Sequence, residues 1–274
     1  MAASLVPRSL VWATDIDVLT ADRVLQRHQD CVVVRSPGNP RHFWGNFLLF
    51  GDAPHPGDAQ RWERRFEELF AGHPEVGHRA FGWDRVDGEN GAAGEFRERG
   101  YELQETVGLV AAPGAVRAHP RANREVTIRA LDPRGDTEWW ARVVELQVAG
   151  REPRFSEASY RRFRQTRIGD LRAMFASGRG SWYAAVLGDE VVASCGIVVT
   201  GGRGRFQAVD TAQAHRRRGI CSRLVADAAR DAADRFGARS LVIAADVHYH
   251  ALGLYESLGF ARRERVAGVE LARV

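Results

Sequence analysis

The stretch 220–245 constrains the fold more than any other part of the sequence. Apolar residues recur at helical spacing from Ile220 to Phe236, which predicts a helix with one buried face, and Gly237 supplies its end. The apolar run Leu241–Ala245 follows without a polar interruption, which is typical of a strand that is covered on both faces. This part of the chain therefore belongs to a sheet that carries helices.

Further elements are predicted on both sides of this helix and strand. They comprise strands at 126–129, 182–186, 191–199, 205–211 and 263–271, two helices capped by Asp136 and Ser156, and a short helix at 249–258. Gly188 and Asp189 separate two of the strands, and this pair is a hairpin signal. The resulting order, βααβββαβαβ, predicts a mixed α/β (α+β) sheet.

The segment 112–123 is the predicted boundary between two domains, 1–115 and 124–274. It contains two prolines and a glycine between two patterned regions. In the first domain we expect strands at 31–34, 47–50, 79–84 and 103–111 and helices at 58–71 and 95–99. At 274 residues the chain is long enough for each of two domains to bury a core.

All 39 basic residues are arginines, and this excludes reactions that need a lysine, such as Schiff-base formation. The arginines are spread along the chain and mixed with 35 acidic residues, for a net charge of +4. A nucleic-acid-binding protein would gather its basic residues into a stripe. We therefore expect small anionic ligands and no nucleic acid.

The three cysteines, Cys31, Cys195 and Cys221, are far apart and have neither the spacing of metal ligands nor that of a disulfide framework. No metal site is expected. No apolar run approaches the length of a membrane span, and residues 1–8 lack the pattern of a signal peptide. These features predict a cytoplasmic protein that has no membrane partner and is a monomer or a homodimer.

Thr211–Leu224 carries the clearest chemical signal. This segment lies between a predicted strand and the long helix, whose first backbone N–H groups have no partner within the helix and lie at its positive end. Gly219 permits a close approach of the backbone, and the arginines at 216–218 add positive charge. These features suit a pyrophosphate, although a solvated arginine cluster before an ordinary helix would have the same letters.

Two motifs resemble the GNAT acetyltransferase superfamily. The coenzyme A loop of that family, Gln/Arg-x-x-Gly-x-Gly/Ala, is matched by Arg216–Cys221, with cysteine in the last position. A second signature, Ala-x-x-Leu-Tyr-Glu-x-x-Gly-Phe, is similar to Ala251–Phe260. The spacing between the motifs holds one helix and one strand, as in the family, and the resemblance covers roughly 125–271. It implies a GNAT-like acyl-CoA N-acyltransferase fold.

The resemblance also implies a role for each site residue. The backbone of Val209–Thr211 would pair with the pantetheine arm of acetyl-CoA, and Tyr255 would be the catalytic acid that protonates the departing thiolate. The cofactor-binding set is Val209, Asp210, Thr211, Arg216, Arg217, Arg218, Gly219, Ile220, Cys221, Ser222 and His248. His248 stands where many members have asparagine.

The implied reaction is the direct attack of a primary amine, in a small molecule or a peptide, on the thioester of acetyl-CoA. A backbone N–H near a bulge in the central strand would stabilise the oxyanion. The candidate bases are Asp210, Asp246, His248 and His250, and the sequence does not choose among them or between them and a base from the first half of the chain. The alternative is a non-catalytic acyl-CoA-binding or regulatory protein on the same fold.

The first domain shows the same strand–helix–strand–helix–strand order, and Phe96–Tyr101 echoes Tyr255–Phe260. Its loop at 51–57 has two prolines and no arginine cluster, so it cannot copy the phosphate cradle. We therefore take two tandem GNAT-like copies, the first degenerate, as a hypothesis. The alternative is an unrelated α/β extension.

Overall fold

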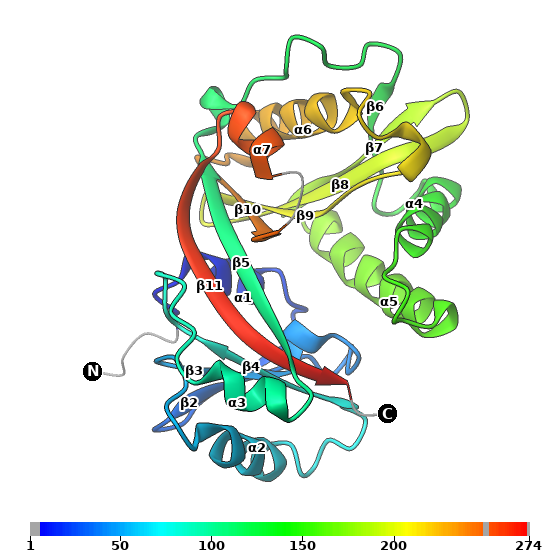
Figure 1. Cartoon of the computed structure of the whole chain (residues 1–274). Helices are drawn as coiled ribbons and strands as arrows, with labels where there is room; N and C mark the ends of the chain where they lie inside the picture. The colour runs from blue at the N-terminus through cyan, green and yellow to red at the C-terminus, as the bar shows by residue number, and fades with distance from the viewer. Residues whose placement is uncertain (1–5, 249–251, 273–274) are drawn as a thin grey trace. The chain divides into compact units, whose positions relative to one another are not determined.

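The computed structural model describes residues 6–248 and 252–272 (Figure 1). The chain forms two compact units that are discontinuous in sequence. Unit 1 comprises Met1–Gly108, Ala244–Tyr249 and Arg263–Val274, and unit 2 comprises Leu109–Ile243 and His250–Arg262. Three strands, β5 (Glu102–Ala111), β10 (Ser240–Asp246) and β11 (Ala261–Ala272), contribute residues to both units. The predicted division into 1–115 and 124–274 is a single cut in the chain and stays a prediction.

Unit 1 is a sheet with the strand order β1-β2-β3-β4-β11-β5. Its other elements are α1 (Leu10–Asp17), β1 (Val24–Arg27), β2 (Cys31–Arg35), η1 (Phe43–Gly45), β3 (Phe47–Phe50), α2 (Asp58–Leu69), β4 (His78–Trp83) and α3 (Ala93–Glu98). β3 and β4 are parallel, and α2 connects them, whereas β11 runs antiparallel to β4. The predicted strands and helices of this region are confirmed, but α1 and β1 were not predicted.

Aromatic packing explains why α2 forms where it does. Trp62 and Phe66 recur four residues apart and are both almost fully buried, so one face of the helix enters the core. The indole of Trp62 stacks on Phe50 of β3, with ring centroids 3.7 Å apart. Phe81 of β4 meets Phe66 edge to face, with ring centroids 5.8 Å apart. α2 is thus fixed on the parallel pair that it connects.

Unit 2 has the strand order β5-β10-β9-β8-β7-β6. Its further elements are η2 (Pro113–Ala115), β6 (Thr127–Ala130), α4 (Thr137–Ala149), α5 (Glu157–Ala176), β7 (Gly180–Leu187), β8 (Glu190–Thr200), β9 (Arg203–Thr211), η3 (Gln213–His215), α6 (Ile220–Phe236) and α7 (Leu252–Ser257). The mixed α/β fold and the βααβββαβαβ order are confirmed. Residues 249–251 of the predicted last helix lie outside the described residues.

Helices cover both faces of the sheet in unit 2. Trp182 of β7 contacts Trp140 of α4, and the next residue, Tyr183, donates its hydroxyl to Asp231 of α6. Because neighbouring strand residues point to opposite faces, α4 and α6 lie on opposite sides of the sheet. α5 packs beside α4.

Two predicted caps had different outcomes. The side chain of Ser156 accepts a hydrogen bond from the amide of Ser159 and caps α5, as expected. Asp136 precedes α4 but does not cap it, because its carboxylate accepts bonds from the Asp132 amide and from Arg129 instead.

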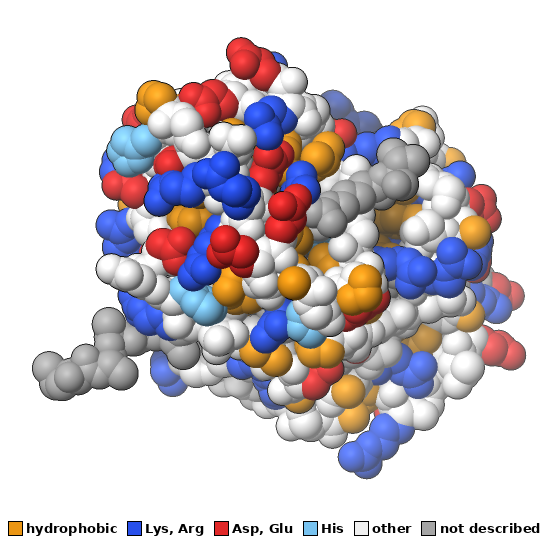
Figure 2. Space-filling model, turned by 90° about the horizontal axis from the view of Figure 1, so that it is seen from below, with side chains coloured by type: hydrophobic (Ala, Val, Ile, Leu, Met, Phe, Trp, Pro, Cys, Tyr) orange, Lys and Arg blue, Asp and Glu red, His pale blue; other side chains and the backbone are white. Residues whose placement is uncertain are grey.

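The surface carries both signs of charge. Figure 2 shows acidic and basic side chains interspersed on the face seen from below. Within 6–248 and 252–272, no helix is both long and apolar enough to cross a membrane.

Candidate functional site

The parallel strands β9 and β10 are paired only over the first part of their length and then splay apart. Their pairing joins only Arg203–Arg205 to Ser240–Val242, yet β9 continues to Thr211. The backbone of β9 beyond residue 205 is therefore not paired with β10, and it can accept an extended ligand as an added strand. The predicted contacts of the pantetheine arm, Val209, Asp210 and Thr211, lie on this stretch.

A β-bulge lies on the same stretch of β9. Gln207 is opposite Gly196 of β8, and Asp210 is opposite Ser194, so Ala208 and Val209 together face one residue of the partner strand. Ala208 has a φ of 41°, which is rare outside glycine. Such a bulge re-aims the backbone locally. The bulge that we expected in the central strand is therefore present, and the role of a backbone N–H beside it stays a prediction.

The loop that follows β9 ends in a row of open backbone amides. Arg217 and Gly219 both adopt positive φ, 62° and 72°, and this curls the chain just before α6. No acceptor within the described parts of the chain binds the amides of residues 217 to 222, and the first amide of α6 bonded inside the helix is that of Arg223, to the Gly219 carbonyl. Consecutive amides in such a curl, at the positive end of a helix, form a concave site for an anion.

The three arginines of the loop are all exposed but differ in their contacts. Arg216 folds back and donates from Nε to the Thr211 carbonyl at the end of β9, at 3.2 Å. Arg218 pairs with Glu125, also at 3.2 Å. Arg216 therefore links the open strand edge to the row of amides.

The predicted boundary segment is a strap that packs on this site. We call residues 113–126 the strap. The His119 amide donates to Ser222 Oγ at 2.7 Å, and the Asn123 amide donates to the Gly219 carbonyl at 3.2 Å. The other end of the strap reaches α7, where the Arg117 amide donates to the Leu258 carbonyl at 3.0 Å.

The strap changes the interpretation of Gly219. We expected its missing side chain to leave room for the ligand. A Cβ there would lie 2.3 Å from the Arg121 carbonyl oxygen and 2.9 Å from the Asn123 nitrogen. The space beside Gly219 is thus occupied by the strap, and glycine is required by this contact and by its positive φ. Gly259 of the second motif meets the strap in the same way, with a Cβ position 2.6 Å from the Ala115 carbonyl oxygen.

The corresponding helix of unit 1 begins very differently. Gly57 precedes α2, and its amide donates to both carboxylate oxygens of Glu95, at 3.0 Å each. Asp58 adds a second carboxylate in the first turn and accepts from the His55 amide. The start of α2 thus already holds acidic groups of its own, which is consistent with a first copy that lacks the cofactor loop.

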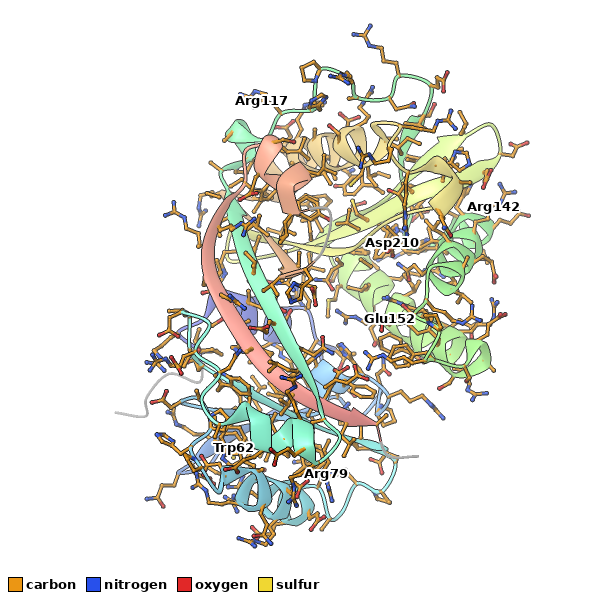
Figure 3. All side chains as sticks on the ribbon, viewed as in Figure 1. Trp62, Arg79, Arg117, Arg142, Glu152 and Asp210 are labelled. Carbon is orange, nitrogen blue, oxygen red and sulfur yellow. The ribbon has the colours of Figure 1, made fainter. Side chains whose placement is uncertain are left out.

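Two titratable side chains of the site have raised pKa values. Asp210 is labelled in Figure 3. Burial raises the pKa of this carboxyl group, against the opposing effect of the positive charges of Arg164 and Arg216. Burial, together with the charge of Asp210, raises the pKa of Cys221 to about 12. The Cys221 thiol is therefore neutral near pH 7, although it lies in the first turn of α6, where a thiolate would be favoured.

Tyr255 and the other candidate bases lie on different elements. Tyr255 belongs to α7, is 2% exposed and packs against Phe260. Asp246 ends β10 and accepts a bond from the His248 amide at 2.7 Å. His248 is exposed and belongs to unit 1, so its contact with the cofactor stays a prediction. His250 lies outside the described residues.

Polar residues near the bulge were not singled out from the sequence. Arg167 of α5 is buried and donates to Gln207 at 3.0 Å, directly before the bulge. Ser194, opposite Asp210, is fully buried, and its hydroxyl has no partner in the part of the chain that is described. The buried Gln147 of α4 likewise has an unsatisfied amide. Of these three residues only Gln147 had a signal in the sequence, because it is a polar residue within the apolar stripe of its helix.

These features define a class of protein. A splayed parallel strand pair, a bulge at the split and an open helix start suit an extended ligand that carries an anionic group. Within the two described ranges, no cluster of three or more acidic, histidine or cysteine residues suits a metal ion. Residues 140–260, which include β9, α6 and α7, match the sequence model of the acetyltransferase (GNAT) family. This segment is therefore a GNAT-family domain, and the resemblance based on the two motifs is confirmed.

Solved structures share the fold over both units. A functionally unknown conserved protein from Staphylococcus epidermidis is 14% identical with a TM-score of 0.73, and the match covers 92% of this chain and 95% of that chain. A GCN5-related N-acetyltransferase from Kribbella flavida is 16% identical with a TM-score of 0.63, and the match covers 95% of this chain and 93% of that chain. A tandem GNAT protein from the clavulanic acid biosynthesis pathway is 15% identical with a TM-score of 0.57, and the match covers 98% of this chain and 90% of that chain. This similarity supports a tandem fold. No curated protein sequence is significantly similar to the chain.

Proposed function

We propose that the protein is an N-acetyltransferase that moves an acetyl group from acetyl-CoA to a primary amine. The observation that carries this proposal is the row of open amides from Arg217 to Ser222, beside a strand edge that no other strand covers among the described residues. A diphosphate joined to an extended amide-bearing arm is complementary to both features. The family of the 140–260 segment supports the same chemistry.

Each part of acetyl-CoA would have its own contacts. The amides at the start of α6 would bind the diphosphate, with Arg216 and Arg217 adding positive charge. The free edge of β9 from Val209 to Thr211 would pair with the pantetheine arm. The bulge at Ala208 would present a backbone N–H to the thioester oxygen.

The reaction needs two proton transfers in addition to the attack. The neutral amine forms a C–N bond with the thioester carbon, and the C–S bond breaks. Asp210 would accept the proton that the amine must lose, because its raised pKa brings a carboxylate closer to the range in which a general base is effective. Tyr255 would donate its hydroxyl proton to the departing sulfur. The acetylated amine and coenzyme A are the products.

The exchange Tyr255→Phe tests whether the site is catalytic. We expect kcat to fall on the order of 10²-fold, while the Kd for acetyl-CoA, measured by calorimetry, changes little. The control is Tyr183→Phe, since Tyr183 is equally buried, at 2% exposed, but bonds to Asp231 of α6. Equal turnover in both variants would refute the catalytic role of Tyr255. If the wild type binds acetyl-CoA but shows no measurable turnover, the alternative of a non-catalytic acyl-CoA-binding protein is favoured.

The acceptor is proposed only as a class. It is a primary amine in a small molecule or a peptide, and we propose that the reaction takes place in the cytoplasm, without nucleic acid or membrane as a partner. A panel of amines scored for coenzyme A release would identify the acceptor.

A further inference from the structure

The acceptor amine of the proposed reaction would reach Asp210 on one particular face of the sheet in unit 2. Asp210 lies opposite Ser194 of β8, so the two side chains point to the same face. Trp182 of β7 shares this face, because it lies opposite Gly196, two residues after Ser194. Trp182 contacts α4, and a Cβ on Gly196 would lie 3.4 Å from Phe175 of α5. The face that carries Asp210 is therefore the one that α4 and α5 cover.

α5 runs along β9 in the opposite direction. Arg179, directly after α5, donates to the last residue of β8, which lies opposite the first residue of β9. Arg167, in the middle of α5, donates to Gln207 at 3.0 Å. Arg164 precedes Arg167 by three residues, so it shares the same side of α5 and lies one turn nearer to Asp210. The positive charge of Arg164 accordingly acts on Asp210 and opposes the rise in its pKa.

Arg164 is held in place by aromatic residues of its own helix. The side chain is partly buried, and its Nε and Nη2 both donate to the Tyr160 hydroxyl, at 2.9 and 2.6 Å. The guanidinium carbon lies 5.0 Å from the ring centroid of Tyr160 and 5.3 Å from that of Phe163. These contacts leave Nη1 unused. A planar guanidinium that is fixed in this way suits a carboxylate, whose two oxygens match its N–H groups.

Several polar groups on this face have unmet bonding capacity. Neither Asp210 nor Arg164 forms an ion pair with a residue that the structure describes. The hydroxyl of Ser194 and the side-chain amide of Gln147 in α4 are buried, and within the described ranges they have no hydrogen-bond partner. Buried polar groups without partners cost free energy. A ligand with one positive and one negative group would pair with both charges.

We propose that the acceptor is an amine that also carries a carboxylate, and that Arg164 binds this carboxylate. The amino group lies at Asp210, which is the base of the proposed reaction. Arg164 is then a residue that determines specificity and takes no part in the proton transfers. This inference rests on the proposed acetyl transfer, but the binding of an amino acid can be measured without turnover.

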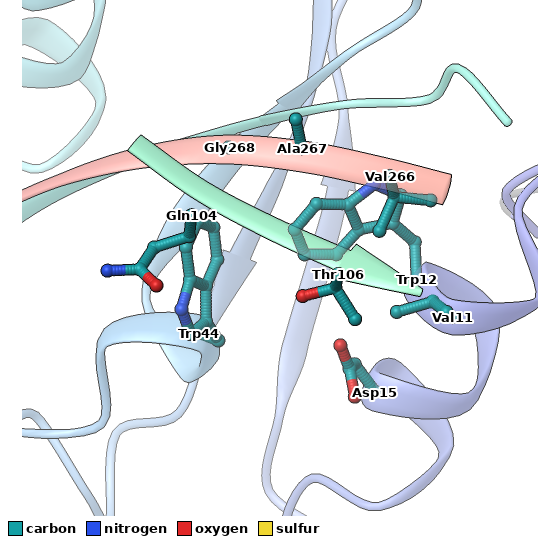
Figure 4. Close-up of a pocket in the computed structure, with 9 residues that line it drawn as sticks. All are labelled: Val11, Trp12, Asp15, Trp44, Gln104, Thr106, Val266, Ala267 and Gly268. Atoms are coloured by element: carbon teal, nitrogen blue, oxygen red, sulfur yellow. The ribbon is translucent and has the colours of Figure 1, made fainter. Parts of the chain in front are cut away.

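The pocket of about 90 Å³ in unit 1 does not offer the same chemistry (Figure 4). It lies between α1, η1, β5 and β11, and the indoles of Trp12 and Trp44 form part of its wall. The nine lining residues drawn in Figure 4 include no arginine or histidine, so a carboxylate would find no cation there. Trp44→Leu should therefore leave the binding of an amino acid unchanged.

Amino acids and their amides test the carboxylate requirement. The probes are glycine, L-alanine, L-phenylalanine, β-alanine and γ-aminobutyrate, each paired with its amide, in which a neutral group of similar shape replaces the carboxylate. Calorimetry near pH 7 measures their binding to the full-length protein in the presence of millimolar coenzyme A. We expect at least one amino acid to bind about tenfold or more tightly than its amide. If no amino acid binds more tightly than its amide, or none binds at millimolar concentration, the inference is overturned.

Exchanges on α5 locate the carboxylate site. In Arg164→Gln we expect the ratio of the Kd of the amide to that of the amino acid to fall to about one. Comparing the two probes within one variant cancels the effect of the lost charge on Asp210. Arg162→Gln is the matched control and should keep the wild-type ratio, because Arg162 is exposed and lies on the opposite side of α5. Thermal unfolding shows whether each variant is folded, and an unchanged ratio in folded Arg164→Gln would overturn the role of Arg164.

Coenzyme A release from acetyl-CoA with the same probes separates this inference from the proposed function. We expect kcat/KM to be about tenfold or more higher for the preferred amino acid than for its amide. Equal kcat/KM values for all pairs would overturn the inference and leave the acetyl transfer intact. Preferential binding of an amino acid without release of coenzyme A would overturn the acetyl transfer and support the carboxylate site.

Discussion

At the scale of single residues, Asp210 connects the electrostatics of the site to its chemistry. It lies on the open edge of β9 and is partly buried, and this burial raises its pKa, although Arg164 and Arg216 act in the opposite direction. Removing a carboxylate from water costs free energy unless its charge is paired. This cost distinguishes Asp210 from the other candidate bases named from the sequence. The motif itself does not show how far each candidate is buried, so the sequence could not make this choice.

We expect Asp210→Asn to reduce kcat on the order of 10²-fold or more if Asp210 is the base. The low-pH limb of the wild-type pH–rate profile should have an apparent pKa above the usual range of aspartate, and it should disappear in the variant. The measurement is kcat/KM against pH with a fixed acceptor amine. Asp189→Asn, in the hairpin between β7 and β8, is the control. Turnover equal to that of the wild type in Asp210→Asn would assign the base elsewhere.

The raised pKa of Asp210 also predicts that ionisation of this carboxyl group lowers the free energy of unfolding. The folded protein holds the proton of Asp210 more tightly than the unfolded chain does, so the free energy of unfolding falls as pH rises from the unfolded pKa through the folded one. Asp210→Asn cannot ionise and should be more stable than the wild type above this interval. Urea unfolding at several pH values measures the difference. A less stable variant near pH 7 would show that the ionised carboxylate stabilises the fold.

At the scale of elements, the strap carries the least expected result. Its prolines and glycine predicted a domain boundary, and in the structure it lies within unit 2. There it binds Ser222 and Gly219 at the start of α6 and Leu258 next to α7. Such contacts join residues that lie far apart in the sequence, 103 positions for His119 and Ser222, and no local pattern predicts them. The helices and strands themselves were predicted well, because an apolar stripe is a local feature.

We expect Gly219→Ala to lower the free energy of unfolding by about 1–3 kcal/mol or more, because alanine strains the positive φ and its Cβ meets the strap. The control is Gly169→Ala in α5. Gly169 is exposed and helical, with nothing within 4 Å of a Cβ, so alanine should stabilise the protein there by about 0.5–1 kcal/mol. Urea denaturation measures both. Equal stabilities for the two variants would mean that the strap is not fixed at Gly219.

At the scale of the whole molecule, the last strand of the chain completes the sheet of the first unit. β11 pairs with β4, from Ala267 opposite Trp83 to Ala272 opposite His78. The sequence predicted two similar halves with a boundary between them, and its motif predicted an anion site at the loop before α6. The pairing of β11 with β4 could not be predicted, because strand partners far apart in the chain leave no trace in local periodicity.

This pairing predicts that the first half alone is incomplete. A fragment of residues 1–123 lacks β11 and would expose the edge of β4 together with the core that Val269 fills, a residue that is fully buried. We expect the fragment to aggregate or to unfold without a cooperative transition. Circular dichroism and urea unfolding check this. A cooperative transition with native-like tryptophan fluorescence would contradict the role given to β11.

The central claim is that the start of α6 and the free edge of β9 together hold acetyl-CoA. Amide hydrogen exchange of the full-length protein, with and without acetyl-CoA, measures this directly. We expect slower exchange in peptides that cover Gln207–Thr211 and Arg216–Arg223 and no change in peptides from β2 and β3. If exchange in both β9 and the α6 loop is unaffected at saturating acetyl-CoA, the account of the site is wrong.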